Sequence, residues 1–393
     1  MSAIRQQRPP LLVHVITRLI VGGAQLTVLG LCESLREHFD VRVICGPDEG
    51  AEGSLRNEME ALVPVVVVPE LRRDISPLQD IAAMQALKRA FLRDKPSIIH
   101  THSSKAGILG RMAAPRPPAK VVHTIHGWGH TPDDPRWKRK LFVQLERIAF
   151  RRTDALIAVS EDVRDEGCRL GIAELRDYHV IPEFVDYRPR TQDFSAARRH
   201  ARQTLGLSST DEVLGWVGRF VPQKDPATLV DTLHAVLIAR SELRAVLIGD
   251  GPLRAEVERR LSNLGLSDRV VFAGLRKDAR QLFAAFDVVL HVSRWEGQPR
   301  VVQESIAERV PVVATRVSGL TDIVIPDQTG YLVDPRDGLG LAERLLRVLD
   351  RPDLRAPLPQ SVIDEVEQHN GREGVLTGHL RLYEQLLNGP LQP

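Results

Sequence analysis

The sequence Val213-Leu214-Gly215-Trp216-Val217-Gly218-Arg219-Phe220-Val221-Pro222-Gln223-Lys224-Asp225 begins with a short apolar run and continues into a loop with two cations. Residues 213–217 are continuously apolar, which is typical of a parallel strand that is buried on both faces. The run follows the polar, arginine-rich residues 185–209, which contain no apolar strand. An alternation of strands and helices that stops before this segment starts again here, so two separate α/β domains are expected.

Similar short runs recur on both sides of this strand, separated by longer amphipathic stretches. This alternation indicates βαβ units, and the expected fold class is α/β with two Rossmann-like, doubly wound parallel sheets. Ligands of such sheets bind in a crevice at the carboxyl ends of the strands. The other predicted strands comprise residues 11–16, 41–44, 65–68, 97–100, 121–124, 154–160, 245–248, 270–272, 288–292, 312–315 and 331–333.

The same pattern sets the expected domain boundaries. Residues 1–190 form an N-terminal Rossmann-like domain, and residues 191–370 form a C-terminal one that begins with a helix near residues 194–205. Residues 371–393 form a closing helix and tail, because apolar side chains recur there at helical spacing. These side chains are Val375, Leu376, Leu380, Leu382 and Leu386.

The bulk composition is that of an ordinary soluble globular protein. The 393 residues include 53 basic and 51 acidic side chains, so the formal net charge is only +2. This balance argues against nucleic-acid binding through bulk charge, and no nucleic-acid partner is expected. Cys32, Cys45 and Cys168 are odd in number and far apart, which fits a reducing, cytoplasmic location. The apolar run at residues 11–16 is too short for a signal-peptide core or a membrane span.

The loop after the strand at residues 213–217 is a candidate ligand site. Gly218 ends the strand, and Arg219 and Lys224 follow on the same loop. An Arg fork and a Lys point charge together can neutralise a diphosphate. They would also favour its departure, because negative charge grows on a diphosphate as the bond to it breaks. A solvated loop would look the same in isolation, since the chain holds 53 basic residues.

A second polar group, Ser293-Arg294-Trp295-Glu296-Gly297-Gln298-Pro299-Arg300, follows the predicted strand at residues 288–292. Gly297 supplies a turn, and Pro299 suits the first position of a helix, where its missing N–H would be unpaired anyway. The start of that helix would offer free N–H groups and a partial positive charge to a ligand. Glu296 and Glu304 are candidate hydrogen-bond acceptors for a sugar hydroxyl and a ribose diol. The alternative is that Glu304 is merely an acid favoured near a helix N-terminus.

Several motifs occur in order along the second half: Gly218-Arg219, Lys224, Gly249-Asp250-Gly251-Pro252, Val271-Phe272-x-Gly274, the pair Glu296 and Glu304, and Pro311-Val312-Val313-Ala314-Thr315. Together they resemble the donor-binding half of glycosyltransferase family 4, whose members are retaining enzymes. The resemblance implies the GT-B fold, two Rossmann-like doubly wound domains facing a central cleft. It also implies that Arg219 and Lys224 bind the donor diphosphate, that Glu304 binds the ribose, and that Glu296 faces the donor sugar. The donor-binding residues it implies are Gly22, Gly23, Gly218, Arg219, Lys224, Gly249, Gly251, Gly297, Gln298, Pro299, Arg300 and Glu304.

The first half resembles a bacterial branch of the family that builds surface polysaccharides. Gly22-Gly23-Ala24-Gln25 follows the first strand, where glycines let the backbone approach a ligand closely. The other matching motifs are Arg73-Asp74-Ile75-Ser76-Pro77, His100-Thr101-His102-Ser103-Ser104-Lys105-Ala106-Gly107 and His123-Thr124-Ile125-His126-Gly127. The last motif carries the family's cleft histidine, His126. The resemblance implies Ser104, Lys105 and His126 on the acceptor side, and His126, Arg219, Lys224 and Glu296 as catalytic residues.

Some signals are weaker or depart from the family pattern. Where the family commonly has Pro-Asn-Gly-Val-Asp, this chain reads Pro182-Glu183-Phe184-Val185-Asp186, so an acid and an aromatic are expected to reshape the cleft floor. Gly249-x-Gly251 is no dinucleotide fingerprint, because Arg254 replaces the third glycine. Asp133-Asp134 lie in a polar loop without spaced partners, and no metal site is expected.

The sequence therefore predicts transfer of a sugar from a nucleoside diphosphate sugar, with a UDP-sugar favoured, to a glycan or lipid-linked acceptor in surface polysaccharide or glycolipid biosynthesis. The resemblance implies a hexosyltransferase that retains the anomeric configuration without a metal or another cofactor. In the family's mechanism, the leaving diphosphate helps to deprotonate the acceptor on the same face. Two alternatives remain open: a sugar-nucleotide 2-epimerase on this scaffold, which would consume no acceptor, and a non-enzymatic sugar-binding protein of the periplasmic kind, which would need a signal peptide.

The segment Pro135-Arg136-Trp137-Lys138-Arg139-Lys140-Leu141-Phe142 places four cations around a tryptophan. If it continues as a helix, Trp137, Leu141 and Ile148 share one face. A basic amphipathic helix of this kind can lie in the headgroup region of an anionic leaflet. A peripheral contact with the inner face of the cytoplasmic membrane is then expected through Arg136, Trp137, Lys138, Arg139 and Lys140. The alternative is a solvated basic helix whose apolar stripe packs on its own domain.

Overall fold

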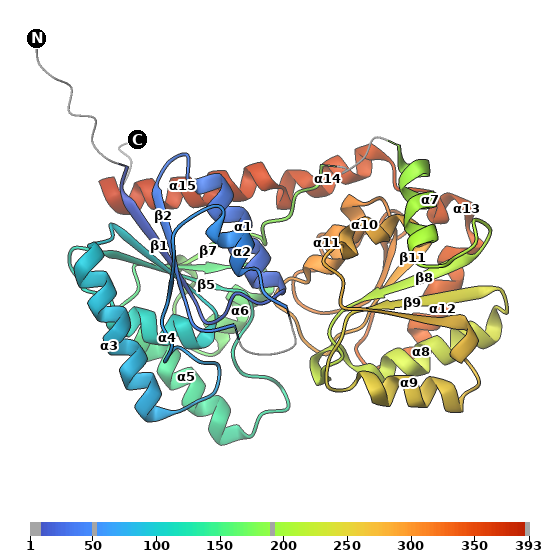
Figure 1. Ribbon diagram of the computed structural model, residues 1–393, viewed down its shortest axis with the longest axis horizontal. Helices are drawn as coiled ribbons and strands as arrows, with labels where there is room; N and C mark the ends of the chain where they lie inside the picture. The colour runs from blue at the N-terminus through green and yellow to red at the C-terminus, as the bar shows by residue number, and fades with distance from the viewer. Residues whose placement is uncertain (1–8, 49–52, 189–192, 390–393) are drawn as a thin grey trace, which may run out of the picture. The chain divides into compact units, whose positions relative to one another are not determined.

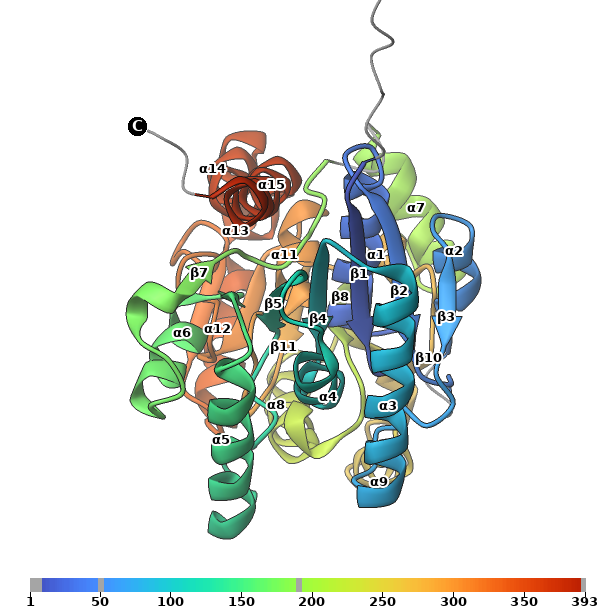
Figure 2. The ribbon, with the colours of Figure 1, turned by 90° about the vertical axis from the view of Figure 1, so that its left-hand side faces the viewer.

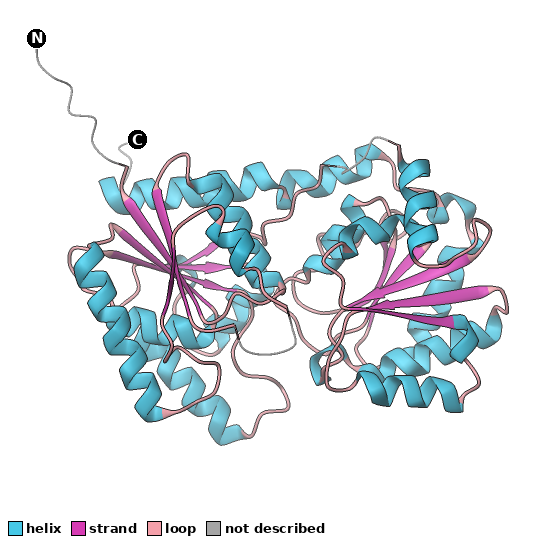
Figure 3. Cartoon of the chain, viewed as in Figure 1, coloured by secondary structure: helices cyan, strands magenta, loops and turns pink. Residues whose placement is uncertain are grey.

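The structure is a computed structural model that describes residues 9–48, 53–188 and 193–389. The chain forms two compact units: unit 1 comprises Met1–Phe184 and Glu373–Pro393, and unit 2 comprises Val185–Arg372. Each unit contains one sheet with helices on both faces (Figures 1 and 3). The expected boundary between residues 190 and 191 lies outside the described residues.

Unit 1 is built on a seven-stranded sheet in which all neighbouring strands are parallel. Its strands are β1 (Leu11–Ile16), β2 (Asp40–Cys45), β3 (Val65–Val67), β4 (Ile98–His102), β5 (Lys120–Ile125), β6 (Ala155–Ala158) and β7 (Tyr178–Val180). Their order across the sheet is β3-β2-β1-β4-β5-β6-β7. The order reverses between β1 and β4, and the crevice outside such a reversal is where doubly wound sheets bind ligands.

Alternation along β1 sends its side chains to two different core layers of unit 1. Leu12 and Ile16 join one apolar cluster, which includes residues of the first and last helices, whereas Val13 and Val15 join another. The third, fourth and fifth helices lie side by side on one face of the sheet (Figure 2). The helices are α1 (Gly23–Leu35), α2 (Arg56–Glu60), α3 (Pro77–Asp94), α4 (Ser104–Ala113), α5 (Arg136–Phe150), α6 (Glu161–Arg169) and α15 (Arg372–Asn388), of which α15 belongs to unit 1 from Glu373 onward.

Unit 2 repeats this architecture with six parallel strands. Its strands are β8 (Glu212–Val217), β9 (Leu243–Ile248), β10 (Val270–Gly274), β11 (Val288–His291), β12 (Val312–Thr315) and β13 (Gly330–Val333). Their order is β10-β9-β8-β11-β12-β13, so the reversal falls between β8 and β11. The helices are α7 (Phe194–Thr204), α8 (Pro226–Ala239), α9 (Arg254–Asn263), α10 (Ala279–Leu282), α11 (Arg300–Ala307), α12 (Gly338–Asp350), α13 (Pro352–Arg355) and α14 (Gln360–Asn370).

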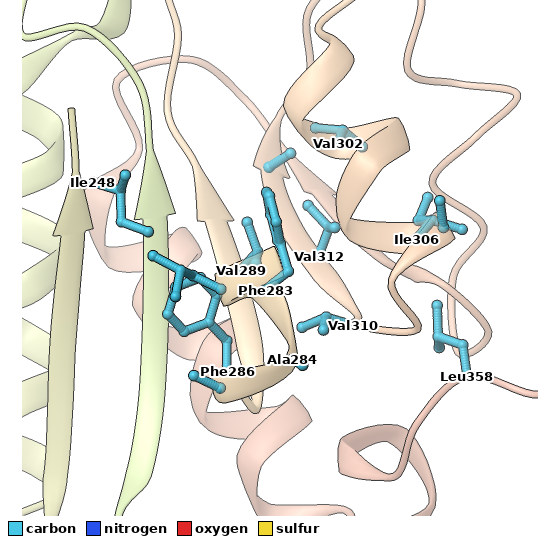
Figure 4. Close-up of a cluster of buried hydrophobic side chains, with 14 of the residues drawn as sticks. Ile248, Phe283, Ala284, Phe286, Val289, Val302, Ile306, Val310, Val312 and Leu358 are labelled. Carbon is cyan, nitrogen blue, oxygen red and sulfur yellow. The ribbon is translucent and has the colours of Figure 1, made fainter. Parts of the chain in front are cut away.

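Helix α11 is fixed by one apolar face. Val302 and Ile306, four positions apart, are fully buried and belong to the same cluster as Val289 of β11 and Val312 of β12 (Figure 4). The helix begins at Arg300, and Pro299 is its N-cap, so the predicted start at Pro299 differs by one position. The packing of α11 therefore holds the polar residues at its start beside the carboxyl end of β11.

Candidate active site

In unit 2, the loops after β8 and β11 meet at the point where the strand order reverses. Strands β8 and β11 are direct neighbours, and Lys224 and Glu296 come from the loops that follow them. Lys224 Nζ lies 2.6 Å from Glu296 Oε1, and the two side chains are only 13% and 12% exposed. The structure thus brings together two of the four residues that the sequence nominates as catalytic.

Glu296 is held by several donors besides Lys224. The Ser293 hydroxyl donates to its Oε1 over 2.7 Å, and the Gln223 amide donates to its Oε2 over 3.1 Å. Gln223 also donates to the Trp295 carbonyl over 3.1 Å and accepts from the Arg294 backbone N–H over 2.8 Å. Gln223 therefore ties the two loops together. The local sequence predicts no role for Gln223, because its partner Trp295 lies 72 positions away.

His291, at the end of β11, is the buried neighbour of this group. Its Nε2 lies 3.3 Å from the Ser293 hydroxyl and 3.9 Å from Glu296 Oε1. Burial, and secondarily the charge of Lys224, hold the pKa of His291 well below its usual value. His291 is therefore neutral near pH 7, and Lys224 supplies the positive charge beside Glu296.

Most of the other predicted donor residues of unit 2 lie around the start of α11. Arg300 donates to Glu304 over 3.2 Å within the helix, and the side chains are 12% and 15% exposed. The Gln298 amide donates to the Asn370 side chain over 3.1 Å. Gly297 lies in the turn before the helix, where its carbonyl would be 2.7 Å from a Cβ added at Gly319. The side chains of Gln298 and Glu304 thus already have partners inside unit 2. Gln298 lies just before α11 and Glu304 lies within the helix, as the sequence predicts.

Gly249 and Gly251 shape the neighbouring loop through close backbone packing. Both have positive φ values, +136° and +154°. A Cβ at Gly249 would lie 1.8 Å from the Gly218 carbonyl oxygen, and one at Gly251 would lie 2.7 Å from the Phe220 backbone nitrogen. The absence of side chains there lets the loop after β9 press against the loop that carries Arg219.

In unit 1, two predicted residues of α4 are engaged with their neighbours. Lys105 Nζ lies 2.5 Å from Asp80 Oδ1 on α3 and also donates to the Asp74 carbonyl. Ser104 packs closely against Gly129, where an added Cβ would lie 2.3 Å from its hydroxyl oxygen. These contacts give both residues a structural role, and their expected part on the acceptor side stays a prediction.

His126 follows β5, and both of its ring nitrogens are engaged within unit 1. Its Nδ1 lies 2.8 Å from Glu183 Oε1, and its Nε2 lies 3.1 Å from His102 Nδ1. Glu183 also accepts from the Thr27 hydroxyl on α1. The sequence flagged Glu183 as a departure from the family pattern but did not predict either partner.

His14, His100 and His102 are fully buried beside His126, with ring nitrogens close enough to hold a metal ion. Hydrogen bonds within the protein already engage both nitrogens of His100, one with Tyr383 Oη at 2.6 Å and one with Thr124 Oγ1 at 2.7 Å. Burial first, and neighbouring histidines second, lower the pKa of His14 to about 3 and hold those of His100 and His102 well below their usual values. We therefore interpret the three rings as a neutral, hydrogen-bonded core and propose no metal for them.

Comparisons with known proteins match both halves of the chain. The family model described as Glycosyltransferase Family 4 matches residues 21–188, and the one described as Glycosyl transferases group 1 matches residues 211–351. A D-inositol 3-phosphate glycosyltransferase of Acidothermus cellulolyticus is 31% identical over 333 residues, which are 78% of this chain and 72% of the relative. The chain belongs to glycosyltransferase family 4.

A further relative of this family 4 glycosyltransferase agrees in enzyme class, and a solved structure agrees in fold. A UDP-Gal:alpha-D-GlcNAc-diphosphoundecaprenol alpha-1,3-galactosyltransferase of Escherichia coli is 29% identical over 347 residues, 86% of this chain and 87% of the relative. The crystal structure of Anabaena HepE in complex with UDP and glucose superposes with a TM-score of 0.80 at 22% identity, covering 95% of this chain and 98% of HepE. The predicted enzyme class and the predicted GT-B fold of two Rossmann-like domains are confirmed.

Helix α5 of this glycosyltransferase exposes the predicted apolar stripe of Trp137, Leu141 and Ile148, and Leu145, which was not predicted, is exposed as well. Trp137, Leu141, Leu145 and Ile148 are 68%, 50%, 38% and 45% exposed, so the alternative of a stripe packed on its own domain does not hold. Within the described ranges, no helix is long and apolar enough to cross a membrane.

Proposed function

We propose that this glycosyltransferase moves a hexose from a UDP-sugar to a lipid-linked or glycan acceptor, with retention of the anomeric configuration. The observation that carries the proposal is the pairing of Lys224 with Glu296 at the strand reversal of unit 2. The donor and the lipid-linked acceptor are supported by the E. coli relative, whose name specifies UDP-Gal and a diphosphoundecaprenol acceptor. HepE, which crystallised with UDP-glucose, supports the same nucleotide.

Lys224 has hydrogen-bonding capacity for both a carboxylate and a diphosphate. An ammonium carries three N–H donors, and Glu296 accounts for one of them at 2.6 Å. With Arg219 on the same loop, Lys224 would stabilise the charge that develops on the leaving diphosphate. The diphosphate would in turn take the acceptor's proton as the new bond forms on the same face.

Glu296 and Glu304 would then hold the sugar and the ribose. A carboxylate offers about four acceptor positions. Lys224, Ser293 and Gln223 together take three of those of Glu296, which leaves one for a sugar hydroxyl. The contact of Glu304 with Arg300 takes one position and leaves the others for the ribose. The start of α11 would add backbone N–H groups, in keeping with the predicted roles of Gln298 and Pro299.

Calorimetry with UDP, GDP and ADP, followed by assays with the matching nucleotide sugars, tests this proposal. We expect UDP to bind most tightly and a UDP-sugar to be consumed faster when a diphosphoundecaprenol-linked acceptor is present. Proton NMR of the product should show the donor's anomeric configuration. A product with inverted anomeric configuration would contradict retention. Epimerisation of the donor sugar in the absence of an acceptor would contradict the transferase proposal and favour the 2-epimerase alternative.

Sugar transfer is expected to continue in excess EDTA. The reason is that two cations, Arg219 and Lys224, lie on the loop proposed to bind the diphosphate, where they can neutralise its charge. Turnover would be measured before and after chelation, with magnesium or manganese added back. A loss in EDTA that either ion restores would show that a divalent ion stabilises the leaving group.

We also propose that α5 contacts the membrane that carries a lipid-linked acceptor. The stripe of Trp137, Leu141, Leu145 and Ile148 is exposed, and Arg136, Arg139 and Lys140 lie on the same helix. Leu78 and Ile81 of α3, and Ile75 just before it, are also exposed, at 82%, 50% and 79%. Cations around apolar side chains match the headgroup region of an anionic leaflet.

A further inference from the structure

Three imidazoles of unit 1 form a row that ends on a carboxylate. His14 Nδ1 lies 2.9 Å from His102 Nε2, and His102 Nδ1 lies 3.1 Å from His126 Nε2. His126 Nδ1 lies 2.8 Å from Glu183 Oε1. We call His14, His102 and His126 the histidine row. It runs from the fully buried His14 to His126, whose side chain is 10% exposed.

Proton counting gives this row a single direction. A neutral imidazole donates from one nitrogen and accepts at the other, whereas an ionised carboxylate only accepts. With a neutral His126, its hydrogen must be on Nδ1 to reach Glu183, so His102 and His14 must also carry their hydrogens on Nδ1. The row then ends at a bare Nε2 of His14, and this atom is buried without a hydrogen-bond partner among the described residues. The carboxylate at one end thus selects the tautomer of all three rings.

The other oxygen of Glu183 reaches a different element. It accepts from the hydroxyl of Thr27, which lies on α1. Gly30, three positions later on α1, makes room for the neighbouring Phe184, because a Cβ there would lie 2.3 Å from the Phe184 ring. The pair Glu183 and Phe184 is therefore fitted to one face of α1, the helix that starts at Gly23.

We propose that Glu183 is a positioning residue of the active site, which holds His126 in its Nδ1–H form with one oxygen and the start of α1 with the other. The elements that it joins carry His126, Gly22 and Gly23, the residues of unit 1 that we expect at the substrate, so this inference rests on the proposed function. An asparagine or glutamine amide has a single acceptor oxygen, whereas a carboxylate has two. The acid at position 183 thus serves both donors at once.

The test combines a tautomer measurement with kinetics on the full-length protein. Ring nitrogen NMR of ¹⁵N-histidine-labelled protein in alkaline buffer reports which nitrogen of each ring carries the hydrogen, and a His126→Gln variant assigns the signal. We expect the Nδ1–H form at His126 in the wild type. Glu183→Ala should abolish this preference and lower kcat/KM by about 10- to 100-fold, as expected for a lost hydrogen bond to a charged group.

Glu183→Gln and Thr27→Val keep the test decisive if Glu183→Ala does not fold. The glutamine retains an acceptor for His126, so it should preserve the Nδ1–H form and restore most of kcat/KM. Thr27→Val leaves the contact between Glu183 and His126 in place, so the tautomer should stay and kcat/KM should fall less than in Glu183→Ala. Glu146→Gln is the matched control, because Glu146 is equally buried but pairs with Arg111, and it should not alter the tautomer at His126.

Two results would overturn the inference. One is an Nε2–H form of His126 in the wild type, and the other is an unchanged Nδ1–H form with unchanged kcat/KM in Glu183→Ala. The first result needs no substrate, since the tautomer is read without turnover, whereas the second also needs a UDP-sugar that the wild type turns over. A wild type with the expected tautomer but no transfer from any UDP-sugar would instead count against the proposed function.

Discussion

Replacing Lys224 by Ala is expected to weaken UDP binding by about 1.5–3 kcal/mol, the range for a hydrogen bond to a charged group. The Lys224 side chain is only 13% exposed, so its charge is screened less by salt than that of a surface lysine. Its removal also leaves the Glu296 carboxylate without its cation, beside the place where we propose that the diphosphate binds. Arg219→Ala should weaken binding within the same range, because it removes the other cation of the loop.

Calorimetry with UDP measures both effects. Arg259→Ala is the matched control: it also removes one positive charge from unit 2, but from an exposed position on α9, and its affinity should stay at the wild-type value. Unchanged UDP affinity in both Lys224→Ala and Arg219→Ala would contradict the proposal that this loop binds the diphosphate. An equal loss in Arg259→Ala would mean that net charge matters and that the loop does not.

The alternation of apolar runs and amphipathic stretches was enough to predict most of the two sheets. Buried parallel strands need continuous apolar segments, and such segments are visible without knowledge of their neighbours. β7 escaped prediction because Tyr178-His179-Val180 is short and contains a polar residue. Helix α14 escaped because only Ile363 and Val366 of its 11 residues are firmly buried apolar positions.

The site in unit 2 was predictable for a related reason. Lys224 and Glu296 both follow parallel strands, and the carboxyl ends of parallel strands share one edge of a sheet. Their 2.6 Å contact, however, requires β8 and β11 to be neighbours in the sheet. The local sequence pattern does not reveal the order of the strands, so this contact could not be predicted. Gln223 was missed for the same reason, since its three contacts all cross between the two loops.

The histidine row could not be predicted from the sequence. His14, His102, His126 and Glu183 come from four separate segments, and their alignment requires the order of β1, β4 and β5 together with the path after β7. The family pattern marked position 183 as unusual, but it predicted neither His126 nor Thr27 as a partner of Glu183. Only the three-dimensional structure shows that Glu183 accepts hydrogen bonds from two donors, His126 and Thr27.

Anionic vesicles are expected to carry the wild-type protein in flotation and to release a variant in which Lys138, Arg139 and Lys140 are all replaced by Ala. Each cation near an anionic surface contributes about 1 kcal/mol, so three together correspond to a change of roughly 100-fold in partitioning. Lys138 also pairs with Asp134 at 2.5 Å, which makes its share the smallest of the three. The exposed Trp137 and Leu141 would add apolar burial in the headgroup region.

Two comparisons separate membrane docking from simple charge attraction. A control with Arg199, Arg259 and Arg336 replaced by Ala removes the same charge from exposed positions of unit 2 and leaves α5 unchanged, and it should float like the wild type. Trp137→Ala with Leu141→Ala keeps every cation, and it should weaken flotation if the apolar stripe enters the headgroup region. Equal recovery of the wild type and the α5 triple variant, or no flotation of either, would contradict membrane docking through α5. If flotation is lost in the α5 triple variant but unchanged in the variant with Trp137→Ala and Leu141→Ala, the contact is purely electrostatic. High salt should then abolish flotation of the wild type.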